Sequence, residues 1–166
     1  MFFYELVNLG LKIRRYPDDD MVSKINQNID NSRFIWNKLL KEYQNTYKIF
    51  KFYGYSKLKC NMTTFNTMLN MLKREYDFLY LSESSILQQV YRDLINAYNK
   101  FFHVECAYPR FKSKKHDKKS FRIQNNSNIK IKYNTLYLPK LGEVYYRTSK
   151  KNRTEKNSKK QDYILN

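Results

Sequence analysis

Hydrophobic residues recur at three- and four-residue steps from position 22 to position 50 of the chain. This spacing predicts one long amphipathic helix with a single apolar face. Asp18, Asp19 and Asp20 precede it and indicate a helix start, because an aspartate caps free backbone amides and its charge complements the helix dipole. The alternative is a metal-binding acidic cluster, and no second acidic cluster faces these residues. The hydrophobic positions are Val22, Ile25, Ile29, Trp36, Leu39, Tyr43, Tyr47 and Phe50.

Two more amphipathic helices are expected further along the chain. The second spans Thr63 to Tyr76, and the third starts near Ser82 or Ser84, either of which is a suitable cap, and continues to Phe102. Three such helices can bury a small core together, so their aromatic residues are interpreted mainly as packing. Between the first two helices, the basic and aromatic segment 52–60 contains Gly54 and indicates a loop. The hydrophobic positions are Phe65, Met68, Leu69 and Leu72 in the second helix, and Leu87, Val90, Tyr91, Leu94, Tyr98 and Phe101 in the third.

The two ends of the chain show strand patterns instead. Leu9, Leu11 and Ile13 alternate with polar residues and glycine, which predicts a strand over 3–15 that stops at Tyr16-Pro17. Because the short strands after Pro109 need a partner sheet, the N-terminal strand is expected to join them. The polar segment 148–166 is predicted to be disordered. The later strands are expected over Ser120–Ile123, Ile129–Tyr133, Leu136–Leu138 and Val144–Arg147, with turns at 125–128, Asn134 and Gly142.

Positive charge dominates the composition and is unevenly distributed. The chain has 32 Lys and Arg against 15 Asp and Glu, a formal net charge of +17. Residues 1–109 carry +4 of this and residues 110–166 carry +13. Such a charge favours a polyanionic partner, either nucleic acid or an anionic membrane. The segment Arg110 to Arg122 lacks the apolar helical face of a membrane-binding segment, so nucleic acid is favoured and no membrane partner is expected.

The candidate binding residues lie mainly in one basic run. Lysine and arginine neutralise phosphates, while interleaved Phe111 and Phe121 can stack on unpaired bases. The alternative is a solvated basic loop without a partner. Lys12, Arg14 and Arg15 are expected on the adjacent strand, where they would extend the patch. The basic residues of the run are Arg110, Lys112, Lys114, Lys115, Lys118, Lys119 and Arg122.

Signs of enzymatic chemistry are missing from the sequence. His103 and His116 have no carboxylate or cysteine partner suited to catalysis, and Cys60 and Cys106 are too few for a four-cysteine zinc site. The three glycines are isolated and form no phosphate-binding loop. No cofactor, metal or small-molecule ligand is therefore expected. No stretch approaches the roughly 20 apolar residues of a membrane span, and no signal peptide is recognised, so a reducing cytoplasm is predicted.

Several short motifs occur together in one order. They are Lys12-Ile13-Arg14-Arg15-Tyr16-Pro17, Arg33-Phe34-Ile35-Trp36-Asn37, Leu87–Leu94, Ala97–Phe102, Tyr108-Pro109-Arg110-Phe111-Lys112, Ser120-Phe121-Arg122 and Leu138–Val144. In this order and spacing they resemble the opening of TnpB. TnpB is the OrfB-type protein of bacterial insertion sequences and a relative of the single-effector type V CRISPR nucleases. The resemblance covers roughly residues 9–147.

The resemblance implies an α+β fold in which a three-helix recognition bundle, of the helix-turn-helix type, is inserted into a partial wedge β-barrel. It places the first barrel strand in 1–17, the helical recognition domain in 18–105, and the remaining barrel strands and the basic loop in 106–147. The segment 148–166, whose composition predicts disorder, follows them as a basic tail. The family's RuvC-like nuclease and zinc ribbon are expected to be absent, because the chain ends before they would begin. We therefore expect no enzyme activity.

The implied function is binding of DNA and a structured guide RNA without cleavage, in association with the nucleoid. Proteins of this family recognise a short DNA motif beside the target. Base pairing between the guide RNA and the target DNA supplies the remaining specificity. The expected contacts include amide side chains, because Gln and Asn can pair bidentately with adenine. The alternative roles are a helix cap for Ser84, an exposed helical residue for Gln88 and turn formation for the asparagines. Beside the basic run, the implied contacts are Asn66, Ser84, Ser85, Gln88, Arg92, Tyr108, Asn125 and Asn126.

Two other functions remain open from the sequence. The first is a nuclease-free transcriptional regulator that binds DNA with or without RNA. The second is an accessory subunit that supports a full-length relative through exposed aromatic helices. The high positive charge favours nucleic acid over a protein partner.

Overall fold

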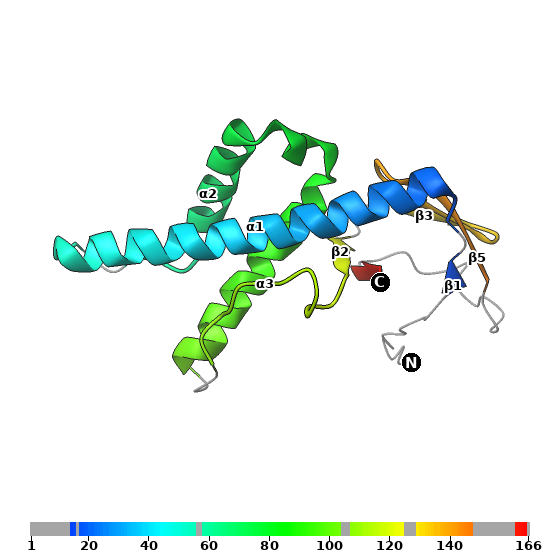
Figure 1. Ribbon diagram of the computed structural model, residues 1–166. Coiled ribbons are helices and arrows are strands. Elements are labelled where there is room, and N and C mark those ends of the chain that lie inside the picture. Colours follow the sequence, from blue (N-terminus) through cyan, green and yellow to red (C-terminus); the bar gives the residue numbers. More distant parts are fainter. Residues whose placement is uncertain are drawn as a thin grey trace, which may run out of the picture.

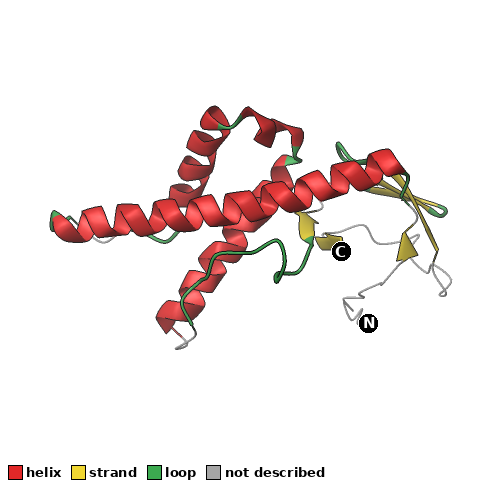
Figure 2. Ribbon diagram, in the orientation of Figure 1, coloured by secondary structure: helices red, strands yellow, loops and turns green. Residues whose placement is uncertain are grey.

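The computed structural model describes residues 14–15, 17–55, 58–103, 107–124, 129–147 and 162–165, with only the backbone described for residues 14, 15, 147 and 162–165. These residues form an α+β arrangement of helices and short antiparallel strands (Figures 1 and 2). The helices are α1 (Asp19–Phe52), α2 (Met62–Glu75), the 3₁₀ helix η1 (Asp77–Leu81) and α3 (Ser84–His103). The strands are β1 (Arg14–Arg15), β2 (Phe121–Gln124), β3 (Lys130–Lys132), β4 (Thr135–Leu138), β5 (Gly142–Arg147) and β6 (Asp162–Leu165).

The long first helix begins where the three aspartates predict it. Asp18 is the N-cap, and its carboxylate accepts a hydrogen bond from the backbone amide of Met21 at 2.7 Å. Asp19 and Asp20 place negative charge in the first turn, where it complements the helix dipole. At 34 residues α1 is about 50 Å long. After it the chain turns at Gly54, whose φ of +68° is readily adopted only by glycine.

A first hydrophobic core joins the C-terminal part of α1 to α2, η1 and α3. In Figure 1, α3 crosses α1, and α2 lies above α1 in this view; α2 also packs against α3, where the rings of Phe65 and Tyr98 lie 6.4 Å apart. The ring of Tyr43 on α1 stacks on Phe65 of α2 at 5.1 Å and lies 4.7 Å from the ring of Tyr98 on α3. This core confirms the packing role that the sequence predicts for the three apolar faces. Its buried members are Ile35, Trp36, Leu39, Leu40, Tyr43, Phe65, Leu69, Leu72, Leu79, Leu87, Val90, Tyr91, Leu94, Ile95 and Tyr98.

The strands form two small sheets. In the four-stranded sheet the order is β1-β5-β4-β3, and every pairing is antiparallel. β1 lies opposite the end of β5, with Arg14 facing Arg147 in register, so the N-terminal strand joins the later strands as predicted. The second sheet pairs β2 with β6. Gly142 starts β5 with a φ of +99°, a conformation that strains any residue with a Cβ atom.

A second hydrophobic core lies between the sheets and the N-terminal turns of α1. Met21, Ile25 and Ile29 of α1 and Ile86 of α3 contribute to it. The strands and their connections supply Phe121, Ile123, Ile129, Leu136, Leu138, Leu141, Val144 and Tyr146. The same helix therefore provides buried side chains to both cores.

Buried polar side chains gather at the junction of the two cores. Asn31 of α1 donates from Nδ2 to the hydroxyl of Ser82 at 2.8 Å, and both residues are buried. Ser82 is therefore a partner of α1 rather than the cap of α3, and Glu83 occupies the position before the first helical residue. Beside this pair, the buried polar residues are Asn28, Ser32, Ser85 and Gln89.

Two features of the fold differ from the sequence predictions. Val22 and Tyr47, expected on the buried face of α1, are 40% and 42% exposed. Near the start of the helix Met21 and Ile25 enter the second core instead of Val22, and after Tyr43 no residue of α1 is buried. Residues 162–165 form β6 on the edge of β2, so the prediction of disorder is wrong for them. The sequence there contains Tyr163 and Ile164, two residue types that are enriched in strands. The rest of the predicted tail, and residues 3–13 of the predicted first strand, lie outside the described residues.

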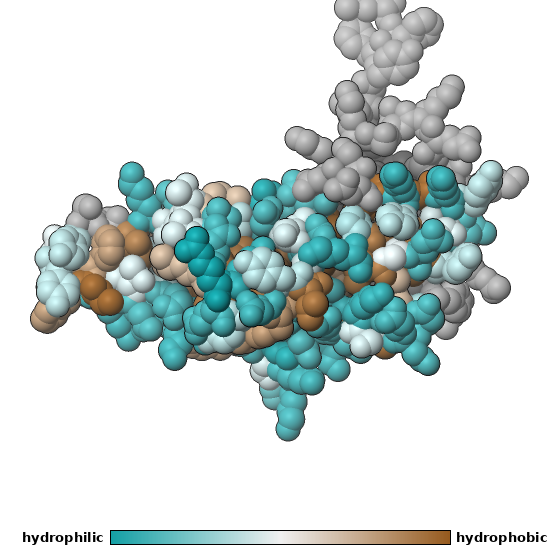
Figure 3. All heavy atoms as spheres, turned by 90° about the horizontal axis from the view of Figure 1, so that it is seen from above, coloured by the Kyte–Doolittle hydropathy of each residue, from teal (hydrophilic) through white to brown (hydrophobic). Residues whose placement is uncertain are grey.

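The free end of α1 carries exposed hydrophobic residues, including Ile49 and Phe52. The space-filling view from above shows hydrophobic residues at that end and hydrophilic ones over much of the remaining face (Figure 3). Within the part of the chain that the structure describes, no helix has both the length and the hydropathy to cross a membrane.

We predict that Leu39→Ala destabilises the protein by about 2–5 kcal/mol, because it opens a cavity in the first core. Leu39 is fully buried between α1 and its partner helices. The matched control is Leu81→Ala at an exposed leucine of η1, which is expected to change stability by less than about 0.5 kcal/mol. Urea denaturation of both variants measures the difference, and equal losses would contradict the assignment of this core.

Candidate nucleic-acid interface

The basic run of the sequence forms a loop, residues 110–120, that lies against α1 (Figure 2). Trp36 of α1 donates from Nε1 to the carbonyl oxygen of Arg110 at 2.9 Å. Asn37 then holds Lys112 at both backbone atoms, with Nδ2 donating to its carbonyl oxygen at 2.9 Å and Oδ1 accepting from its amide at 2.7 Å. These contacts satisfy polar backbone groups with a rigid helix, so the basic loop, as we call residues 110–120, has a defined path over α1.

The side chain of Lys112 belongs to this anchor. Its ammonium lies 4.0 Å from the centroid of the Trp36 ring, a cation–π contact. Burial lowers the pKa of Lys112 below its ordinary value, with the carboxylate of Asp117 acting in the opposite direction. Lys112 therefore packs on α1, whereas the sequence groups it with the phosphate-binding lysines.

A tight turn presents the other lysines of the basic loop. Asp117 accepts the backbone amide of Ser113 at 2.5 Å, and the Ser113 hydroxyl accepts the amide of Lys115 at 3.2 Å. Asp117 also lies 3.8 Å from the guanidinium of Arg110. Asp117 is the one acidic residue of the basic loop, and its carboxylate is engaged within this turn. The exposed cations are Arg110, Lys114, Lys115, Lys118 and Lys119.

On α3 the predicted site residues separate into exposed and buried positions. Among residues 84–92, only Ser84, Gln88 and Arg92 reach the surface, at i, i+4 and i+8 on one side of the helix. We call these three residues the α3 strip. Ser85, predicted on the same face, is only 6% exposed. The Nε atom of Arg92 is buried without a hydrogen-bond partner in the described structure.

The other predicted residues are spread over several elements. Arg122 of β2 forms an ion pair with Asp93 of α3, and the Tyr108 hydroxyl lies 3.0 Å from that of Tyr98. Asn66 is exposed on α2. Arg14 and Arg15 lie in the four-stranded sheet, whereas the basic loop leads into β2 of the other sheet. Lys12, Asn125 and Asn126 lie outside the described residues.

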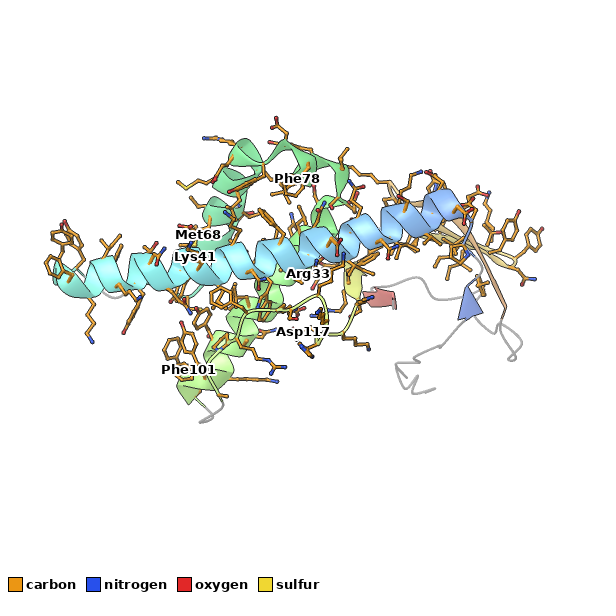
Figure 4. All side chains as sticks on the ribbon, in the orientation of Figure 1. Arg33, Lys41, Met68, Phe78, Phe101 and Asp117 are labelled. Atoms are coloured by element: carbon orange, nitrogen blue, oxygen red, sulfur yellow. The ribbon has the colours of Figure 1, made fainter. Side chains whose placement is uncertain are left out.

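Sequence reasoning missed a group of residues on the solvent side of α1. Asp30, Arg33, Phe34, Asn37, Lys38 and Lys41 line a cavity of about 340 Å³ together with Phe111 of the basic loop. The α1 residues of this group are three or four positions apart in the sequence, which places them on one face of the helix. This spacing is the sequence signal that could have identified them. Figure 4 shows Arg33 and Lys41 on α1 and Asp117 in the neighbouring loop.

The potential metal ligands His103, His116 and Cys60 lie within the described ranges. No group of three or more His, Cys, Asp or Glu residues there is arranged to hold a metal ion. His103 and His116 are exposed. Cys60 is half-buried beside Tyr43, and burial raises the pKa of its thiol.

Comparison with known proteins gives this geometry a family context. Residues 1–51 match the family model of the helix-turn-helix domain of OrfB-type proteins. Over 119 residues the chain is 31% identical to an Escherichia coli (strain K12) protein described as a candidate RNA-guided DNA endonuclease, InsQ, covering 71% of this chain and 28% of that protein. The chain carries the helix-turn-helix region of the TnpB family.

A second relative of this TnpB-family region comes from Streptomyces pristinaespiralis and is also described as a candidate RNA-guided DNA endonuclease. It is 29% identical over 116 residues, covering 69% of this chain and 27% of the relative. The chain thus spans less than a third of the length of both relatives. The described part of the matched segment 1–51 contains β1 and all but the last residue of α1, so α2 and α3 lie beyond it.

We predict that Asn37→Ala releases the basic loop from α1. The change removes two hydrogen bonds to the backbone of Lys112 and should destabilise the folded state by about 1–3 kcal/mol. The Lys112 amide should also lose its protection from hydrogen exchange. Asn70→Ala, at an exposed asparagine of α2, is the control. Unchanged protection of the Lys112 amide in Asn37→Ala would show that the loop is held by other contacts.

Proposed function

We propose that this TnpB-type region binds nucleic acid with the basic loop and reads sequence with the α3 strip. The observation that carries the proposal is the clamp by which Trp36 and Asn37 hold the basic loop on α1. A loop fixed in this way presents its lysines to phosphates without first having to be ordered, which lowers the entropic cost of binding.

The charge around the loop supports a polyanionic partner. Asp117 is engaged in the turn, and Asp30 on the adjacent face of α1 is paired with Arg33 at 2.9 Å. The Nζ atom of Lys114 lies 4.0 Å from the second carboxylate oxygen of Asp30. The nearby acids are therefore neutralised by their neighbours, while Lys115, Lys118 and Lys119 remain exposed for phosphates.

The α3 strip supports a base-reading role. Ser84 lies at the N-terminus of the helix, where backbone amides and the dipole favour a phosphate. One turn further on, Gln88 carries an amide that can pair bidentately with adenine in the major groove. Phosphate contacts would fix the register of the helix, and Gln88 would supply the sequence preference.

The named relatives suggest the partners of this region. They are described as RNA-guided DNA endonucleases, and we propose DNA and a structured guide RNA as the ligands here, bound without cleavage. In this proposal residues 18–105 act as a helical recognition domain inserted into a wedge β-barrel, with strands in 1–17 and 106–147 and a tail in 148–166. A protein with these ligands would work in the cytoplasm, in contact with the nucleoid.

We predict that the basic loop dominates the salt dependence of binding. Replacing Lys114, Lys115, Lys118 and Lys119 by Gln should reduce the slope of log affinity against log salt concentration by up to about 3–4, because each lysine releases counterions from a phosphate. Duplex DNA and structured RNA are both titrated. The control changes four exposed lysines elsewhere to Gln, namely Lys48, Lys51, Lys59 and Lys100. If both sets flatten the slope equally, only net charge matters and the loop has no special role.

We predict that Gln88→Ala weakens binding to a preferred DNA motif by about 1–3 kcal/mol and has little effect on a scrambled duplex. The motif is obtained by selection from random duplexes with the full chain. Gln44→Ala, at a half-buried glutamine of α1, serves as the matched control. Equal loss on the two duplexes would assign Gln88 to packing and remove the base-reading role from α3.

A further inference from the structure

The cavity between α1 and the basic loop has the composition of a nucleotide site. Its volume of about 340 Å³ lies at the lower end of the range, about 300–1,000 Å³, that is typical of ligand pockets. Two phenylalanine rings and three cationic side chains line it, with Asp30 and Asn37 as the other lining residues. This combination matches a planar base attached to a phosphate.

The ring of Phe111 is exposed although its backbone is held. Its neighbours Arg110 and Lys112 are fixed to Trp36 and Asn37 by three hydrogen bonds, yet the Phe111 side chain is 53% exposed. An exposed aromatic side chain on a fixed backbone is a preformed stacking surface, because little conformational freedom is lost when a base packs on it.

Phe34 forms another wall of the cavity and is supported from behind. Its ring packs edge-on against Tyr76 at 4.9 Å and against Phe78 at 5.2 Å. Lys38 lies beside it, with Nζ 2.6 Å from the Tyr76 hydroxyl and 5.5 Å from the centroid of the Phe34 ring. The hydrogen bond with Tyr76 raises the pKa of Lys38, so its ammonium stays charged.

The remaining cations lie where a phosphate could approach. Lys41 is exposed and forms no ion pair with any residue that the structure describes. Arg33 and Lys114 both approach the carboxylate of Asp30, at 2.9 Å and 4.0 Å, and offset its negative charge. The cavity is therefore net positive around an aromatic interior.

We infer that this cavity binds one unpaired base of a single-stranded nucleic acid, stacked on Phe111, with Lys41 contacting the adjacent phosphate. The inference rests on the proposed nucleic-acid binding and adds a preference for unpaired nucleotides, from RNA or from DNA, at a site on α1. An acidic peptide could satisfy the cations. The exposed ring between them favours a base, because stacking needs a planar partner.

The test measures the affinity of the full chain for a short single strand and for an abasic strand of the same length and charge, in RNA and DNA forms. We expect Phe111→Leu to weaken binding of the base-bearing strand by about 5- to 150-fold and to leave the abasic strand unaffected. Phe111→Tyr should restore tight binding, and Lys41→Gln should weaken both strands alike. The matched control is Phe102→Leu, because Phe102 is 51% exposed but lies outside the cavity.

The outcomes separate this inference from the proposed function. Unchanged affinity of Phe111→Leu for the base-bearing strand, with salt-dependent binding preserved, would overturn the base site alone. Displacement of that strand by polyglutamate as readily as by a second nucleic acid of equal charge would also overturn it. No binding of any nucleic acid by the wild-type chain would overturn both. The RNA and DNA arms show which strand the cavity prefers.

Discussion

Burial of α1 from two directions is the interaction on which the rest of the structure depends. Its N-terminal turns pack Ile25 and Ile29 against the sheets, and further along the same helix Leu39 and Tyr43 pack against α2 and α3. Most of the stability of a protein helix comes from tertiary packing of its apolar face, so these two sets of contacts stabilise α1. The polar pair Asn31–Ser82 lies where the two cores meet and links α1 to the segment before α3.

The candidate interface follows from this arrangement. Trp36 has its indole ring in the first core, yet its Nε1 atom reaches the carbonyl oxygen of Arg110. Asn37, the next residue, faces outward and holds Lys112. Core packing of α1 thus sets the position of the basic loop. The cations of α1 and of the loop consequently border one cavity rather than forming two independent patches.

Local patterns predicted the helices well and the site only in part. The spacing of apolar residues and the cap at Asp18 located α1, α2 and α3 to within a few residues, because these signals act over neighbouring turns. The clamp of Asn37 on Lys112 joins residues 75 positions apart, and the hydrogen bond of Asn31 to Ser82 joins residues 51 positions apart. Strand β6 forms by pairing with β2, a strand far from it in the sequence. No local pattern encodes such long-range contacts.

The central claim is that docking of the basic loop on α1 prepares it for nucleic acid. The most direct test is the salt dependence of RNA and DNA binding by Asn37→Ala, which changes no charge. We expect lower affinity at every salt concentration with an unchanged slope of log affinity against log salt concentration, because the same lysines contact the phosphates but must first be ordered. Affinity equal to that of the wild type across the salt series would contradict it.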